Sequence, residues 1–83
     1  MNDFREKLEG YLKKAAPLFE NLSDASPAEV DIKRARREFR EMALAYYKDA
    51  KHFHEKGEYA NALASLEYAE GWMDAGKRLG IFR

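Results

Sequence analysis

The residues best suited to chemistry are acids and histidines in the second half of the chain. Those that could act together are Asp49, His52, Glu67, Glu70 and Asp74. The last three recur at helical spacing, so one side of a helix could present their carboxylates to a divalent cation. The sequence has no Glu-x-x-His pair, and His52 and His54, two residues apart, point to different sides of a helix. We therefore expect no catalytic residue, no metal, no cofactor and no small-molecule substrate, and a protein that is not an enzyme.

A second set of side chains suits binding to nucleic acid. Cations and one aromatic residue recur on one side of the region from 33 to 51: Lys33, Arg36, Arg37, Arg40, Tyr47 and Lys51. Cations neutralise phosphates, and an aromatic ring can stack on a base. Asp31, Glu38 and Glu41 are interleaved, however, and the formal net charge is zero, short of the basic footprint typical of nucleic-acid binders. Nucleic-acid binding is therefore the alternative function and not the first one.

The third candidate is a surface for another protein. On a wheel of about 100 degrees per residue, small and aromatic side chains cluster within about 80 degrees, opposite the apolar positions assigned to the core. They are Ala60, Ala64, Tyr68, Gly71 and Ala75. Alanine is the best helix former, so a solvated alanine stripe would explain most of them. Gly71 favours a contact instead, because mid-helix glycine costs roughly 1 kcal/mol against alanine without a packing reason. We expect a non-enzymatic protein-interaction or oligomerisation module, with a homodimer as one form.

The periodicity of apolar residues predicts three helices that position these side chains. The first spans residues 3–22, with an apolar stripe that we call the first-helix stripe: Phe4, Leu8, Tyr11, Ala15, Leu18 and Leu22, with Leu12 and Phe19 beside them. Pro17 interrupts this helix, but the residues after it stay in phase with those before it. We therefore expect one kinked helix and not two.

The second helix is predicted over residues 27–56. Ser26-Pro27-Ala28-Glu29 forms a capping box with proline at the first helical position. The residues expected inside are Ile32, Ala35, Phe39, Met42, Ala43, Tyr46, Ala50 and Phe53. At about 1.5 Å per residue this helix reaches roughly 45 Å, longer than its neighbours.

The third helix is predicted over residues 58–79. Gly57 is the hinge before it and Gly80 the left-handed residue that ends it, with Ile81 packed back on the last turn. Its expected inward residues are Tyr59, Ala62, Leu63, Leu66, Ala69, Met73 and Gly76. Short connections make neighbouring helices antiparallel. The predicted fold is all-α, a single domain over residues 1–83 formed by a three-helix up-down-up antiparallel bundle with a long central helix.

Asp49 is the polar residue that breaks the inward pattern of the second helix. A buried carboxylate is costly without hydrogen bonds, so we expect Asp49 to bond across the hairpin to Ser65 or to a tyrosine hydroxyl. Such a bond would fix the register of the two helices, and Asp49→Ala would lower the melting temperature.

Composition bears on the compartment in which the protein works and on the chemistry open to it. The 83 residues include no cysteine, which excludes disulfides and thiolate chemistry and fits a reducing compartment. No signal-peptide core or membrane-spanning run is present, so we expect a cytoplasmic protein without a membrane partner. Charged residues make up 36%, and glutamine and threonine are absent, a bias that suits a thermophile.

Two resemblances accompany these patterns. Tyr46-x-x-Asp49-Ala50-x-x-Phe53, then Gly57, Tyr59 and Ala62-x-x-x-Leu66, resembles a single tetratricopeptide-type hairpin. Such repeats need about three copies to bury a continuous core, so this likeness implies a way of packing and no function.

The broader resemblance covers nearly the whole chain. It is carried by Tyr46-x-x-Asp49-Ala50, by Tyr68-Ala-Glu-Gly71-Trp-Met-Asp74-Ala75 and by Leu79-Gly80. In these residues the chain is similar to an archaeal three-helix family, domain of unknown function 357. The resemblance implies a three-helix bundle and no assigned activity.

Overall fold

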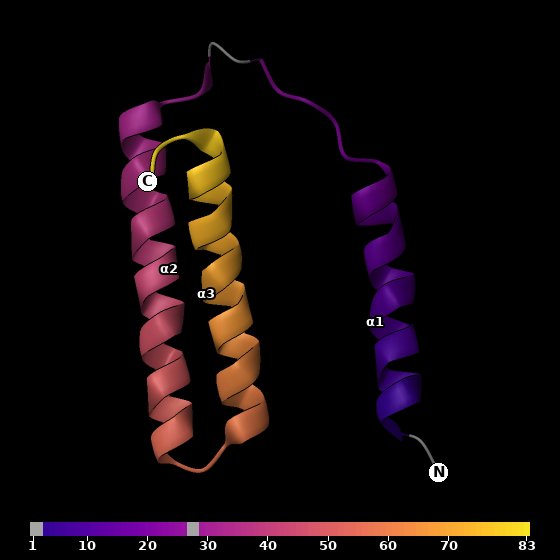
Figure 1. Cartoon of the computed structure of the whole chain (residues 1–83). Coiled ribbons are helices and arrows are strands. Elements are labelled where there is room, and N and C mark those ends of the chain that lie inside the picture. Colours follow the sequence, from indigo (N-terminus) through magenta and orange to yellow (C-terminus); the bar gives the residue numbers. More distant parts are fainter. Residues whose placement is uncertain (1–2, 27–28) are drawn as a thin grey trace.

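The computed structural model describes residues 3–26 and 29–83, and within them every regular element is a helix (Figure 1). The helices are α1 (Asp3–Glu20), α2 (Ile32–Glu55) and α3 (Tyr59–Leu79). They run up, down and up along the chain. The predicted all-α class with three helices in this order is confirmed.

The first helix, α1, is continuous through Pro17, as predicted. It ends at Glu20, and the amide of Asn21 donates to the carbonyl of Pro17 at 3.2 Å, which closes the last turn. Pro17 is exposed, so the lost amide hydrogen bond lies where water can replace it.

The second helix, α2, begins at Ile32, later than the predicted residue 27. Asp31 has an extended backbone, and its side chain accepts a hydrogen bond from the amide of Arg34 at 3.1 Å. Asp31 is therefore the N-cap, a role that the prediction gave to Ser26. Pro27 and Ala28 of the predicted capping box lie outside the described residues.

Glycine ends both helices of the C-terminal half, as predicted. Gly57 has φ 77° between α2 and α3, and the amide of Glu58 donates to Phe53 O at 2.9 Å. Gly80 has φ 90° after α3. The amides of Gly80 and Ile81 donate to the carbonyls of Lys77 and Gly76, respectively, at 3.1 and 3.0 Å, the two bonds of a Schellman motif.

The pairing of α2 with α3 holds the fold together. Phe39 meets Trp72 edge-on with ring centroids 5.0 Å apart, and Tyr46 meets Tyr68 in the same way at 4.3 Å. Edge-to-face aromatic pairs add to the burial of apolar area. The buried hydrophobic residues of the described chain are two alanines: Ala50 is 7% exposed and Ala69 is 5% exposed. This core is small even for a small domain.

The helix α1 lies apart from this pair, which is a departure from the expected bundle. Among the described residues α1 makes no contact with α2 or α3, whereas α2 and α3 contact each other along their length. Residues of the first-helix stripe are exposed, Phe4 at 78% and Leu18 at 71%. On α3 the predicted inward residues Leu63 and Met73 are exposed as well. An apolar stripe predicts that something covers it but does not specify which surface does so.

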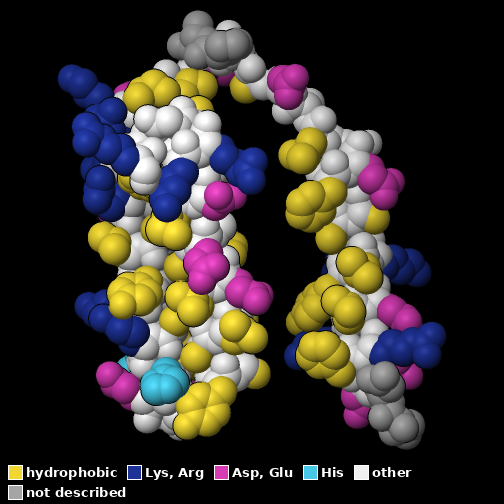
Figure 2. Space-filling view, in the orientation of Figure 1, with side chains coloured by type: hydrophobic (Ala, Val, Ile, Leu, Met, Phe, Trp, Pro, Cys, Tyr) yellow, Lys and Arg dark blue, Asp and Glu magenta, His cyan; other side chains and the backbone are white. Residues whose placement is uncertain are grey.

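The described helices form a layer about one helix thick. The principal extents of the chain are 50 × 35 × 15 Å. Figure 2 shows hydrophobic side chains on the same viewed face of α1 and of the α2/α3 hairpin. Apolar surface of both α1 and the hairpin is therefore present on this face of the layer.

Gly76 tests how closely the C-terminal tail packs on α3. A Cβ built at Gly76 would overlap the ring of Phe82, whereas one built at Gly71 meets nothing within 4 Å. We expect Gly76→Ala to destabilise the chain by roughly 0.5–2 kcal/mol, because steric overlap outweighs the gain in helix propensity. The matched control Gly71→Ala should stabilise it by about 0.5–1 kcal/mol. Urea unfolding followed by circular dichroism measures both changes, and equal stabilisation by the two would contradict the packing of Phe82.

Candidate functional site

The hairpin of α2 and α3 has two broad sides, and the predicted protein-binding residues lie on one of them. We call this set the helix-three surface: Ala60, Ala64, Tyr68, Gly71 and Ala75. All of them are exposed. Tyr68 was placed opposite the core, but its ring packs against Tyr46 of α2 while remaining 50% exposed. The helix-three surface therefore reaches the seam between the two helices.

A shallow hollow on this side brings aromatic and small residues together. It is lined by Phe39, Glu67, Tyr68, Gly71, Trp72 and Ala75. The Trp72 ring lies between Phe39 and Tyr68, 5.0 Å from the first centroid and 6.4 Å from the second. No described atom lies near the place of a Gly71 Cβ. The close contact expected at Gly71 is therefore not supplied by the described part of this chain.

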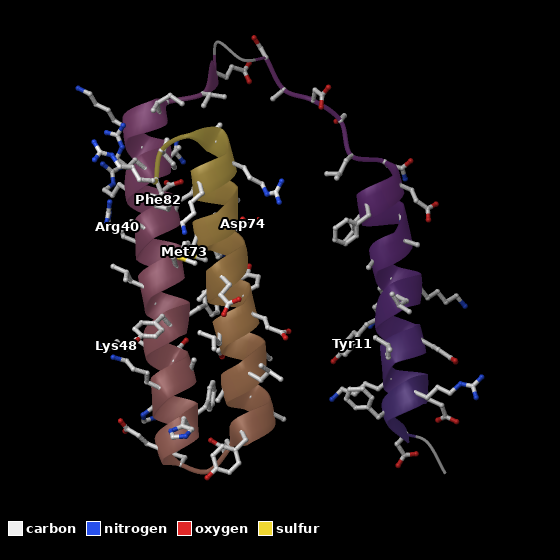
Figure 3. The ribbon with its side chains drawn as sticks, viewed as in Figure 1. Tyr11, Arg40, Lys48, Met73, Asp74 and Phe82 are labelled. Carbon is white, nitrogen blue, oxygen red and sulfur yellow. The ribbon has the colours of Figure 1, made fainter. Side chains whose placement is uncertain are left out.

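The opposite side of the hairpin carries a groove that the sequence reading missed. We call it the basic-rimmed groove, and it is lined by Arg40, Ala43, Leu44, Met73, Lys77, Ile81, Phe82 and Arg83. Its floor is apolar and its charged residues are all cations. None of these cations belongs to an ion pair found among the described residues. Figure 3 shows Arg40, Met73 and Phe82 in the half of the hairpin that lies nearer the C-terminal tail.

The C-terminal tail forms one wall of the groove. The ring of Phe82 lies against Gly76, and the guanidinium of Arg40 lies 5.3 Å from the centroid of that ring. This cation–π contact joins the tail to α2, across from the helix that the tail follows. The sequence carries no signal for this contact, because Gly76 is one of several helical glycines and the spacing of Arg40 and Phe82 does not indicate that they meet.

The predicted basic side of α2 is present as an exposed stripe. Its members Lys33, Arg36, Arg37, Arg40, Tyr47 and Lys51 are all exposed. Figure 2 shows Lys and Arg side chains gathered along α2. Within the stripe, the ammonium of Lys51 lies 4.8 Å from the centroid of the Tyr47 ring.

Two acids of the hairpin are paired with arginines outside the stripe. Glu38 pairs with Arg34 and Asp74 pairs with Arg78, each at 2.9 Å. These hydrogen bonds, and then the carboxylate charges, raise the pKa of Arg34 and of Arg78. The two acids therefore do not neutralise the basic stripe.

The acids and histidines considered for metal binding do not converge. Within residues 3–26 and 29–83 no group of three or more His, Cys, Asp or Glu side chains could hold one ion. Asp74 faces Arg78, and the ring of His54 lies beside Tyr59 with centroids 5.6 Å apart. These residues are spread along the hairpin as surface groups.

Comparison with known families assigns the chain. The family model described as "Protein of unknown function (DUF357)" matches residues 5–82. The chain belongs to this family. The match confirms the resemblance read from the sequence, and it spans all three helices. No curated protein and no solved structure matches the chain. Among the described residues of this DUF357 protein, no helix has the length and apolar composition that crossing a bilayer requires.

Asp49 is exposed in this DUF357 protein, so the expectation of a buried, hydrogen-bonded carboxylate was wrong. Its neighbour Ala50 is the residue that enters the interface, at 7% exposure. The bond expected across the hairpin, to Ser65 or to a tyrosine hydroxyl, is not found among the described residues.

Because Asp49 is exposed, its replacement should have little effect on the stability of the fold. Asp49→Ala should change the free energy of unfolding by less than about 0.5 kcal/mol, because an exposed side chain without a partner loses little. Ala50→Asp is the adjacent control and should cost at least roughly 2 kcal/mol, because it buries a carboxylate. Chemical denaturation measures both. A large loss for Asp49→Ala would show that the side chain has a partner after all.

Proposed function

We propose that this chain is a non-enzymatic helical module that associates with another protein chain, a second copy included, through the helix-three surface. The observation that carries the proposal is Gly71, which lies exposed in a mostly apolar hollow with no described atom within 4 Å of the place of its Cβ. A mid-helix glycine costs roughly 1 kcal/mol against alanine, and no contact inside the described chain offsets that cost.

The shape of the hollow suits a helix. Small residues let a second helix approach closely, and the Tyr68 and Trp72 rings beside them supply large apolar area for a partner side chain to contact. Aromatic residues are enriched in the buried centres of protein interfaces.

The unburied apolar surface supports association in general. Two hydrophobic residues are buried in the described chain, while sixteen large ones are exposed. A stable interface covers about 800 Å² on each partner, roughly a tenth of the 7552 Å² that this chain exposes. At about 25 cal/mol per Å² of apolar surface, covering such an area is a substantial driving force.

A matched pair of glycine variants tests the proposal. Gly71→Glu should weaken association at least about tenfold, or roughly 1.4 kcal/mol, because it places a charge in the interface. Gly10→Glu is the control, since Gly10 is also helical, exposed and without neighbours within 4 Å. Sedimentation equilibrium measures self-association, and tagged versions of both variants in native cell extract report on other partners. Equal binding by Gly71→Glu and the unaltered chain in both assays would exclude the helix-three surface.

Nucleic-acid binding is the second candidate, and one observation favours it. Arg36 and Arg40 stand in a cationic stripe and form no ion pair among the described residues, while Glu38 and Asp74 are paired with other arginines. The stripe therefore offers unpaired guanidinium groups for phosphate contacts, despite a net charge of zero.

Salt dependence tests this candidate. If α2 contacts phosphates, the affinity for a single-stranded oligonucleotide should fall steeply as salt rises. Arg36→Ala/Arg37→Ala should then reduce the slope of log affinity against log salt by roughly 1.5, because each phosphate contact contributes about 0.7. Lys13→Ala/Lys14→Ala removes the same charge from α1 and serves as the control. Fluorescence anisotropy measures these slopes, and affinity that does not respond to salt would exclude the candidate.

A further inference from the structure

We propose that α1 of a second copy covers the basic-rimmed groove, so that two chains exchange their first helices. The inference rests on the proposed association function and names one partner, another copy of this chain. It concerns the side of the hairpin opposite the helix-three surface.

The helix α1 has an apolar stripe that needs a cover. Its large members are exposed: Phe4, Leu8, Tyr11, Leu12, Leu18, Phe19 and Leu22. Isolated helices of this length are marginal in water, and packing of the apolar side supplies most of the stability of a protein helix. Figure 3 shows Tyr11 extending from α1 with no contact to the hairpin.

The groove continues along the hairpin far enough to seat this helix. The hollow at Arg40 and Phe82 shares Ala43, Leu44 and Met73 with a second hollow. The second shares Tyr47 and Leu66 with a third, which ends at His54 and Leu63. The three form one channel along most of α3, whose 21 residues span about 31 Å. The 18 residues of α1 span about 27 Å.

Charge favours one direction for the seated helix. The last turn of α1 has no basic residue and includes Glu20, and Asp24 follows it. The C-terminus of a helix also carries the negative end of its dipole. Arg40, Lys77 and Arg83 rim the groove. An acidic, apolar helix end therefore complements a basic, apolar groove end.

The flat layer makes an exchange between two copies direct. Apolar side chains of α1 and of the hairpin appear on the same viewed face (Figure 2), and α1 stands apart from the hairpin within the same thin layer (Figure 1). A two-fold axis parallel to the helices places each α1 over the hairpin of the other copy. The C-terminal end of α1 lies at the same end of the layer as the C-terminal end of α3, where the cations of the groove lie (Figure 1). A two-fold axis parallel to the helices preserves their direction, so the C-terminal end of α1 from one copy meets the cations of the other copy.

Exchange of α1 is compatible with the association proposed above. The hairpin has an apolar hollow on each side, one lined by Tyr68 and Gly71 and the other by Leu44 and Met73. One α1 can cover one side only. Exchange covers the basic-rimmed groove of both copies and leaves both helix-three surfaces open for the association proposed above.

Cross-linking tests the exchange, because the chain contains no cysteine of its own. The double variant Phe19→Cys/Met73→Cys carries one thiol on the first-helix stripe and one in the groove. A short bismaleimide should convert it mainly to a covalent dimer, seen by denaturing electrophoresis. Lys13→Cys/Met73→Cys is the control, with its first thiol on the other side of α1, and should give much less dimer.

Each other outcome overturns the exchange in a recognisable way. A cross-link within one chain, which migrates as a monomer, would show that α1 closes on its own hairpin. Sedimentation as a dimer without this cross-link would show that the copies associate elsewhere, and the proposed function would stand. A strict monomer without either cross-link would overturn exchange between copies, and Gly71→Glu in native extract would then decide the proposed function.

A charge reversal tests the direction of the helix. Glu20→Lys and Lys77→Glu should each weaken the dimer by roughly 2- to 30-fold, because the two-fold axis repeats an exposed pair worth about 1.4- to 5-fold. The double variant Glu20→Lys/Lys77→Glu should recover most of the affinity, a rescue that a folding defect would not show. Additive losses in the double variant would overturn this direction.

Discussion

The pairing of α2 with α3 is the interaction on which the described structure depends. It is fixed at one end by the turn at Gly57 and at the other by Phe82, which lies against Gly76 and beneath Arg40. Between these ends, edge-on aromatic pairs and two buried alanines set the separation of the helices. A two-helix hairpin closed at both ends keeps its register without a third helix. This explains how the pair can be formed while α1 lies apart.

The same arrangement leaves apolar surface on both sides of the hairpin. Two helices in contact bury one stripe each, so residues beside the stripe remain in water. Leu44 and Met73 on one side and Tyr68 on the other stay about half exposed. Small domains bury a limited fraction of their surface, and association is a common way to bury more. The association functions proposed for this DUF357 protein follow from that geometry, and neither needs a chemical step.

Sequence reasoning located the parts of the fold that depend on local signals. Glycine at positions 57 and 80 predicted both helix ends, because each takes a positive φ that other residues avoid. The predicted start of α2 was wrong, because Ser26 and Asp31 are both suitable capping residues and lie only a few residues apart. In the structure the amide of Arg34 donates to Asp31. The structure also corrected Asp49, because its neighbour Ala50 enters the interface of α2 with α3 and the carboxylate stays exposed.

The groove shows why tertiary sites escape such reasoning. Arg40, Met73 and Phe82 belong to three segments, and nothing in their spacing indicates that they meet. The helix-three surface, in contrast, lies on one helix, so its periodicity was readable. Gly76 and Gly71 look alike in the sequence, yet one accommodates Phe82 and the other faces open space. Only the fold separates a glycine that packs against a ring of the same chain from one that faces open space.

Charge placement adds a physical reason for the ends of α1 and α2 to come together. Equal numbers of acidic and basic residues give a net charge of zero, but they are not evenly distributed. The first turn of α2 has no acid and contains Lys33 and Arg34, at the positive end of the helix dipole. The last turn of α1 has no base and contains Glu20, at the negative end of its dipole. The C-terminus of α1 therefore carries charge that its own dipole disfavours, whereas the Asp31 cap supplies an acid at the N-terminus of α2. Both termini lie at the same end of the layer (Figure 1), so an α1 terminus placed against this end of a hairpin brings Glu20 toward cations of the opposite sign.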